Sequence, residues 1–159
     1  MRTVRFWTAV CEIASFFLLV CLLVFFALSH QEVAFQIPGG AQKEKSVLGV
    51  QMSLCLIFAL GILVYGLLFL LKRFPRFMSY PVPITPENMD FQARLAKLML
   101  SVLTLCSMGI FMTILYDTYK NAGREQGIGH IGIILGLLAG AILDVALYLA
   151  VAKAKEKCI

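Results

Sequence analysis

Four long apolar runs constrain this chain more than any other feature of its sequence. The run 46–71 carries no charged side chain, and the run 6–28 carries only Glu12. Both are longer than the roughly 20 residues that a helix needs to cross the hydrocarbon core of a bilayer. Two further apolar runs cover 98–116 and 128–152. We therefore predict an all-α integral membrane protein, a four-helix bundle that forms a single membrane domain over residues 1–159.

The composition excludes the usual soluble classes. Apolar residues make up 60% of the chain and charged residues 14%, and the mean hydropathy is +0.88. A soluble domain needs more polar surface than this composition supplies. The net charge of +5 does not indicate nucleic-acid binding, because the basic residues cluster at the ends of the apolar runs. We expect the lipid bilayer as the surroundings and no nucleic-acid partner.

The distribution of Lys and Arg predicts the orientation. Ten basic residues lie before the first run, in the connection 72–97 or after the fourth run: Arg2, Arg5, Lys72, Arg73, Arg76, Arg94, Lys97, Lys153, Lys155 and Lys157. The other two connections hold Lys43, Lys45, Lys120 and Arg124. The positive-inside rule then places both termini and the connection 72–97 in the cytoplasm. The predicted location is the bacterial cytoplasmic (inner) membrane, with the chain as a multi-pass protein.

The first run has a second interpretation, a secretory signal peptide with Arg2 and Arg5 as its basic start. The apolar region of a signal peptide usually has about 7–15 residues, whereas the run 6–28 is longer. We therefore expect an uncleaved spanning helix.

The predicted cytoplasmic connection 72–97 begins with a proline-rich stretch that cannot be helical throughout. Thr85 followed by Pro86 is typical of a helix N-cap and first helical position. An amphipathic helix is expected to start there and to lead directly into the third span. Its polar stripe holds Glu87, Asp90, Arg94 and Lys97, and its apolar stripe holds Phe91, Leu95 and Leu98. This segment is either a capped, charge-paired entrance to the span or a docking surface for a partner.

The stretch from Tyr80 to Ala96 resembles a loop between helices in SdpI-like bacterial membrane proteins, which carry domain of unknown function 1648. The residues that carry the resemblance are Tyr80, Pro81, Ile84, Thr85, Glu87, Asn88, Gln92, Arg94 and Leu95. The namesake of that family is an immunity protein that protects its producer from a secreted peptide toxin and helps to sequester a repressor at the membrane. The resemblance implies toxin immunity or signalling through a peptide or protein partner.

Two carboxylates fall inside the predicted spans. At 1.5 Å per residue, Glu12 and Asp144 lie roughly 10–12 Å inside the inner boundary of the hydrocarbon core. A carboxylate at this depth is costly unless it faces protein, water or a partner, so both are candidate functional residues. Glu12 either extends toward the inner headgroups or meets a cation that reaches inward. The basic residues in reach of the boundary are Arg5, Lys72 and Lys97.

Asp144 has two interpretations. In the first, its carboxyl forms a hydrogen bond across a helix contact, with Ser101, Thr104 or Tyr148 as the partner. In the second, Asp144 and Glu12 are protonatable groups coupled to a ligand or to a conformational change.

The fourth run also carries a small-residue pattern. Gly132, Gly136, Gly140 and Asp144 are spaced by four residues, which predicts a groove and an acid on one helix face. Such a groove favours close packing against another helix of the chain or against a second copy, which would give a homo-oligomer through this helix.

No pattern in the sequence indicates catalysis, a cofactor or a metal centre. Four of the five cysteines lie inside apolar runs and none has CxxC spacing, which is typical of buried thiols. The topology predicts that His30 and His130 lie on the outer side with Glu32, Asp117 and Glu125, from which a metal site could be assembled, but no spacing typical of a metal-binding helix supports one. We expect no catalytic residues, no metal and no cofactor.

The predicted function is therefore that of a non-enzymatic membrane protein of the SdpI-like group, acting in toxin immunity or signalling. The alternative is a small proton-linked transporter or permease subunit that uses Asp144 and Glu12.

Overall fold

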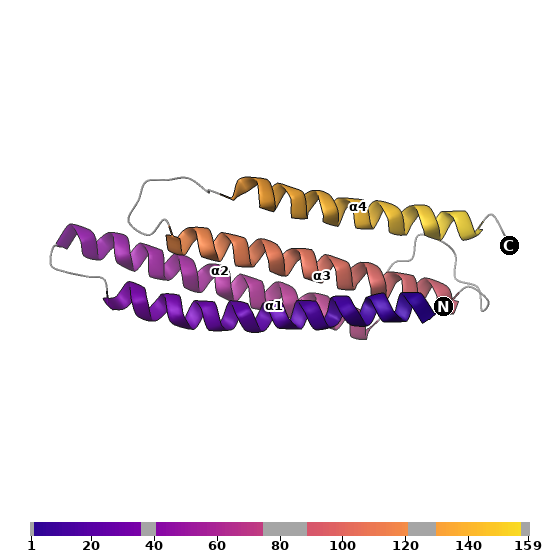
Figure 1. The fold of residues 1–159 in the computed structure, drawn as a ribbon, viewed down its shortest axis with the longest axis horizontal. Coiled ribbons are helices and arrows are strands. Elements are labelled where there is room, and N and C mark those ends of the chain that lie inside the picture. Colours follow the sequence, from indigo (N-terminus) through magenta and orange to yellow (C-terminus); the bar gives the residue numbers. More distant parts are fainter. Residues whose placement is uncertain (1, 36–40, 75–88, 121–129, 157–159) are drawn as a thin grey trace.

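The computed structural model describes residues 2–35, 41–74, 89–120 and 130–156. This part of the chain contains four helices, which are α1 (Arg2–Phe35), α2 (Ala41–Arg73), α3 (Met89–Lys120) and α4 (Ile131–Glu156) (Figure 1). Each is long and apolar enough to cross a membrane. The prediction of an all-α protein with four helices of membrane-spanning length is confirmed.

The helices extend beyond the apolar runs from which they were predicted. α1 continues to Phe35 and α2 begins at Ala41, so Lys43 and Lys45 lie in a helix and not in a loop. Hydropathy marks where the hydrocarbon ends, whereas a helix continues as long as its residues favour it, and Ala, Gln, Lys and Glu are good helix formers. α4 starts at Ile131, and the His130 carbonyl before it accepts hydrogen bonds from the backbone N–H groups of Ile133 and Ile134.

The predicted continuity between the amphipathic segment and the third span is confirmed. α3 is one helix of 32 residues, which is about 48 Å long at 1.5 Å per residue. The hydrocarbon core is only about 30 Å thick, so the ends of α3 project from it or the helix tilts. The predicted start at Thr85 and Pro86 lies outside the described residues.

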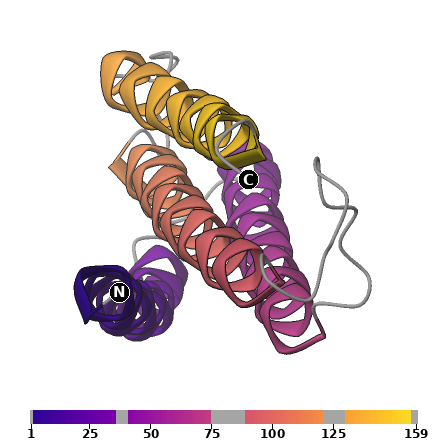
Figure 2. The ribbon, with the colours of Figure 1, turned by 90° about the vertical axis from the view of Figure 1, so that its right-hand side faces the viewer.

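α3 is the central helix of the bundle. α1, α2 and α4 all pack against it, whereas α1 and α2 contact each other less and α4 makes at most marginal contact with either of them. Viewed from one end, α4 lies beside α3 and apart from α1 (Figure 2). The described chain begins and ends at the same end of the bundle (Figure 1). We call it the basic end, because Arg5, Lys72, Arg73, Arg94 and Lys97 lie there.

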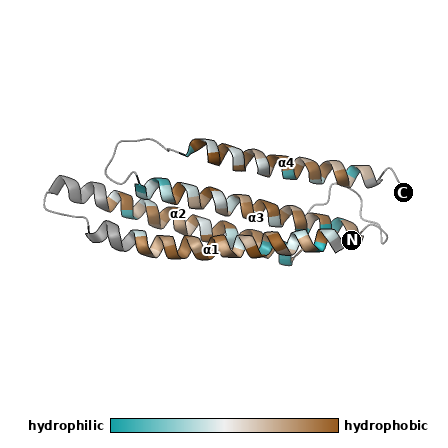
Figure 3. Cartoon of the chain, viewed as in Figure 1, coloured by the Kyte–Doolittle hydropathy of each residue, from teal (hydrophilic) through white to brown (hydrophobic). Residues whose placement is uncertain are grey.

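The surface of the bundle is apolar along the middle of the helices. Ile13 of α1 is 69% exposed and Leu56 of α2 is 67% exposed, and many other large apolar side chains are also exposed. Figure 3 shows this apolar middle, with most of the hydrophilic positions toward the helix ends. A soluble monomer rarely exposes so large an apolar surface, whereas lipid solvates it without cost.

The best-packed part of the core lies at the opposite end, which we call the aromatic end. Leu22, Leu54 and Leu115 are completely buried there, one from each of α1, α2 and α3. Phe26 and Phe58 stack beside them with ring centroids 4.2 Å apart. This cluster holds α1 and α2 against α3.

Hydroxyl groups inside the bundle are satisfied by their own helices. Ser15 donates a hydrogen bond to the Cys11 carbonyl at 2.6 Å, and Thr104 donates to the Leu100 carbonyl at 2.6 Å. Other Ser and Thr residues of α1, α2 and α3 bond in the same way to the carbonyl four residues earlier. This local bonding satisfies polar groups where lipid offers no partner.

Candidate functional site

An ion pair links α1 and α3 near the basic end. Lys97 Nζ lies 3.7 Å from Glu12 Oε1, and the two side chains are 52% and 40% exposed. Among the basic residues in reach of the boundary, Lys97 is therefore the one that meets Glu12. The pair keeps an acid and a base facing the same space, and each charge compensates the other within a membrane helix.

Two neighbouring cavities open around this ion pair. The first has a volume of about 220 Å³ and is lined by Glu12, Tyr65, Phe69, Lys72, Arg73 and Lys97. The second has a volume of about 390 Å³ and is lined by Val4, Arg5, Thr8, Ala9, Glu12, Arg94 and Lys97. Because Glu12 and Lys97 line both cavities, the two spaces adjoin across the ion pair.

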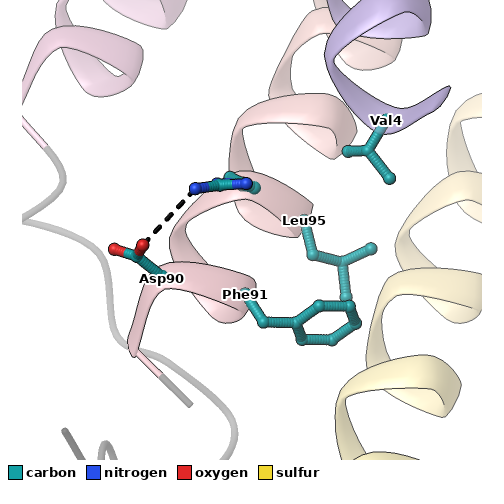
Figure 4. A pocket seen from close by; sticks show the side chains of 5 residues that line it. Val4, Asp90, Phe91 and Leu95 are labelled. Carbon is teal, nitrogen blue, oxygen red and sulfur yellow. Dashed lines mark hydrogen bonds and ion pairs between the residues drawn. The ribbon is translucent and has the colours of Figure 1, made fainter. Parts of the chain in front are cut away.

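A third, smaller cavity continues the system toward apolar side chains. It has a volume of about 80 Å³ and is lined by Val4, Asp90, Phe91, Arg94 and Leu95. Figure 4 shows Val4 of α1 near Leu95 and Phe91 of α3. Arg94 forms an ion pair with Asp90 one turn earlier, at 3.4 Å, which is one of the pairings the amphipathic pattern predicts.

The family-like segment is described only in part. Its positions from Tyr80 to Asn88 lie outside the described residues. Gln92 is 1% exposed, and its Oε1 atom is buried without a hydrogen-bond partner in the described structure. Arg94 and Leu95 line the smallest cavity. The described part of the segment therefore faces the bundle and the cavities at the basic end.

Asp144 lies on the side of α4 that packs against α3. The least exposed positions of α4 recur at the spacing of one helix face and are Ile134, Leu137, Ala141, Asp144, Tyr148 and Ala152. The Oδ2 atom of Asp144 is buried and has no hydrogen-bond partner in the described structure. An unpaired carboxyl oxygen in this position is the least satisfied acidic group of the described chain.

The predicted hydrogen bonds from Ser101 and Thr104 to Asp144 are not formed. Ser101 Oγ donates to the Lys97 carbonyl at 2.9 Å, and Thr104 Oγ1 donates to the Leu100 carbonyl at 2.6 Å. Both hydroxyl protons are thereby used within α3. The backbone acceptor is fixed one turn away, so it competes successfully with a carboxyl on another helix.

The glycines of α4 do not form a single packed face within the chain. A Cβ atom built on Gly132 or Gly136 would meet nothing within 4 Å, whereas one on Gly140 would reach Cys106 Sγ of α3 at 4.0 Å. Each step of four residues turns about 40° around a helix, so Gly132 and Asp144 lie about 120° apart. Only the last members of the series reach α3.

A polar clasp at the aromatic end joins α4 to α3. The carboxyl of Asp117 accepts a hydrogen bond from the His130 backbone N–H at 3.1 Å and pairs with the His130 ring Nδ1. Tyr116 lies beside the His130 ring, with centroids 5.7 Å apart. Sequence reasoning placed Asp117 and His130 on one side of the membrane but did not identify this pair. Within the described residues, no group of three or more potential metal ligands is present.

Comparison of the chain with protein-family models, with curated proteins and with solved structures gives no match.

Proposed function

We propose that this chain is a non-enzymatic membrane protein that binds an apolar peptide or protein segment within the bilayer. The observation that carries the proposal is the position of α4, which packs mainly against α3 among the described helices. Of its most apolar stretch only 6% is buried, compared with 28% for α3. A helix held on one side only has the rest of its surface available to a partner.

Two glycines with open space around them make this surface suitable for close contact with another helix. Gly132 and Gly136 have no neighbour within 4 Å of a Cβ position, and they stand between exposed apolar side chains such as Ile133 and Leu135. Small residues on a membrane helix let another helix approach closely, which is the main source of helix association in lipid. An apolar helical segment, such as a membrane-active peptide, fits this face.

In the SdpI-like interpretation, the bound segment is a secreted peptide toxin, and the Tyr80 to Ala96 segment faces a cytoplasmic partner. With the positive-inside orientation, both termini lie in the cytoplasm of a bacterial cell and α4 is accessible from within its inner membrane. Toxin immunity and signalling both follow from such binding without catalysis.

The test is survival of a toxin-sensitive bacterial host that expresses the chain, during exposure to membrane-active peptides. We expect protection by the wild type and loss of protection with Gly136→Leu. The matched control is Gly66→Leu, because Gly66 on α2 also has nothing within 4 Å of its Cβ position. Equal loss with both variants, or protection that survives Gly136→Leu, would contradict binding on α4.

The second candidate function is proton-linked transport, which is favoured by the unpaired Oδ2 atom of Asp144. A carboxyl with an unsatisfied oxygen inside a membrane helix contact is a candidate for reversible protonation. Asp144→Asn would then abolish transport and leave the mass of the solubilised protein unchanged. Glu12 is less suited to this role, because it is already paired with Lys97.

A further inference from the structure

The cavities at the basic end carry a strong excess of positive charge. Their walls contain five cations, which are Arg5, Lys72, Arg73, Arg94 and Lys97, and two carboxylates, which are Glu12 and Asp90. Five positive charges minus two negative charges leave a net charge of +3. The cations come from α1, α2 and α3, so the three helices surround the space from different sides.

Only part of this charge is neutralised within the described residues, because two carboxylates serve five cations and Glu12 acts on Lys72 as well as on Lys97. Arg94 pairs with Asp90, and Lys97 makes one contact of 3.7 Å with Glu12. No carboxylate of the described residues forms an ion pair with Arg5, Lys72 or Arg73. Unneutralised cations around a hollow that is open to its surroundings favour an anion inside it.

The neighbouring apolar cavity indicates which kind of anion would fit. It shares Val4 and Arg94 with the largest cationic cavity, and Phe91 and Leu95 form its apolar wall. A ligand that fills both spaces has an anionic group and an apolar part. The cavities also lie near the ends of helices long enough to span a bilayer, which is the depth of lipid headgroups.

We infer that the two cationic cavities bind the phosphate group of an anionic phospholipid, with the adjoining apolar part of the lipid against Val4, Phe91 and Leu95. Arg and Lys are the residues that recognise phosphate, Arg through paired N–H donors and Lys as a point charge. The Glu12 carboxylate limits the affinity, because it repels the phosphate and occupies Lys97. This inference is independent of the proposed peptide-binding face, which lies on α4.

The test is the dissociation constant of the first bound lipid, measured on the full chain in neutral detergent by native mass spectrometry. Phosphatidylglycerol is compared with phosphatidylcholine that has the same acyl chains. We expect phosphatidylglycerol to bind at least several-fold more tightly. Replacing both Lys72 and Arg73 by Gln is expected to weaken phosphatidylglycerol binding by roughly fivefold per cation. Phosphatidylcholine binding should weaken less, because the positive choline offsets the charge of the same phosphate group.

The matched control is Lys153→Gln, because Lys153 is an exposed cation near the same end of the bundle that lines none of the three cavities. It is expected to bind phosphatidylglycerol like the wild type. Glu12→Gln is expected to bind phosphatidylglycerol more tightly, because the substitution removes the carboxylate that repels the phosphate. Equal weakening by Lys153→Gln, or an unchanged affinity after loss of Lys72 and Arg73, would overturn the inference.

A soluble phosphate compound shares the same chemistry, and competition distinguishes the two sources. Millimolar glycerol phosphate is added to the protein with phosphatidylglycerol bound. Retention of the lipid is expected, because the soluble compound gains nothing from Val4, Phe91 and Leu95. Displacement of the lipid would overturn its assignment as the ligand.

Discussion

Lys97 of α3 and Glu12 of α1 face each other across the basic end of the bundle, with 3.7 Å between Nζ and Oε1. Each residue would be costly alone in a membrane helix, and together they place one acid and one base at the junction of two cavities. The opposite end is closed by the packed cluster around Leu22, Leu54 and Leu115. Among the described residues, a packed core therefore lies toward one end and two cavities lie at the other.

The Glu12 and Lys97 pair is expected to show a measurable coupling. A double-mutant cycle with Glu12→Gln and Lys97→Met should give a favourable coupling free energy above about 1 kcal/mol, because each charge would be costly alone in a membrane helix. Thermal unfolding in detergent measures the four proteins of the cycle. A coupling near zero would mean that the two charges are solvated independently of each other.

The clasp between Asp117 and His130 is expected to stabilise the contact between α3 and α4. Asp117→Asn should lower the melting temperature of the protein in detergent, because the Asp117 carboxyl bonds to both the backbone and the ring of His130. Asp144→Asn is the matched control, since Asp144 Oδ2 has no partner to lose in the described structure. If Asp144→Asn costs as much as Asp117→Asn, the carboxyl of Asp144 has a structural bond after all.

Gly109 is expected to set the distance between α3 and α4. A Cβ atom built on it would lie 3.0 Å from Leu137 Cδ1, so Gly109→Val should force the helices apart and cost about 1–3 kcal/mol. Gly136→Val has the same change in helix propensity but open space around it, and should be nearly neutral. Disulfide crosslinking between cysteines introduced on α3 and α4 reports the separation. Equal crosslinking yields in both variants would contradict close packing at Gly109.

The core cluster at the aromatic end should respond like the interior of a packed protein. Leu115 is completely buried, so Leu115→Ala is expected to cost about 2–5 kcal/mol. Leu56→Ala is the control, because that side chain is 67% exposed. It contacts lipid or detergent both before and after unfolding, so its loss should cost little. Thermal unfolding in detergent compares the two. A small loss for both variants would mean that the cluster around Leu115 is loosely packed.

The number and type of the helices could be predicted from the sequence because lipid imposes one simple condition, an uninterrupted apolar run. The ends could not, because α1 and α2 continue through polar residues that hydropathy excludes from a span. The depth of Glu12 in its span predicted that a cation from the boundary would pair with it, and Lys97 does so. The sequence could not distinguish Lys97 from Arg5 or Lys72, because the partner depends on how the helices pack.

The arrangement of α4 shows why the rest could not be predicted. Residue spacing identifies a helix face but not the neighbour that covers it, so Gly132 and Gly136 indicated packing that α3 does not supply. The drift of about 40° per four residues separates them from Asp144, which the spacing alone placed on one face. The bond between Asp117 and His130 joins residues from two different helix ends, and no local pattern predicts it.

The most direct test of the account is photocrosslinking in intact bacterial membranes from a photoreactive residue at position 136, beside the same probe at position 66. The account predicts a discrete adduct of the chain with a peptide or a second protein from position 136, and only lipid adducts from position 66. Lipid adducts alone at both positions would contradict a partner on α4. An adduct of twice the chain mass would instead identify a second copy as the occupant and contradict binding of a different partner.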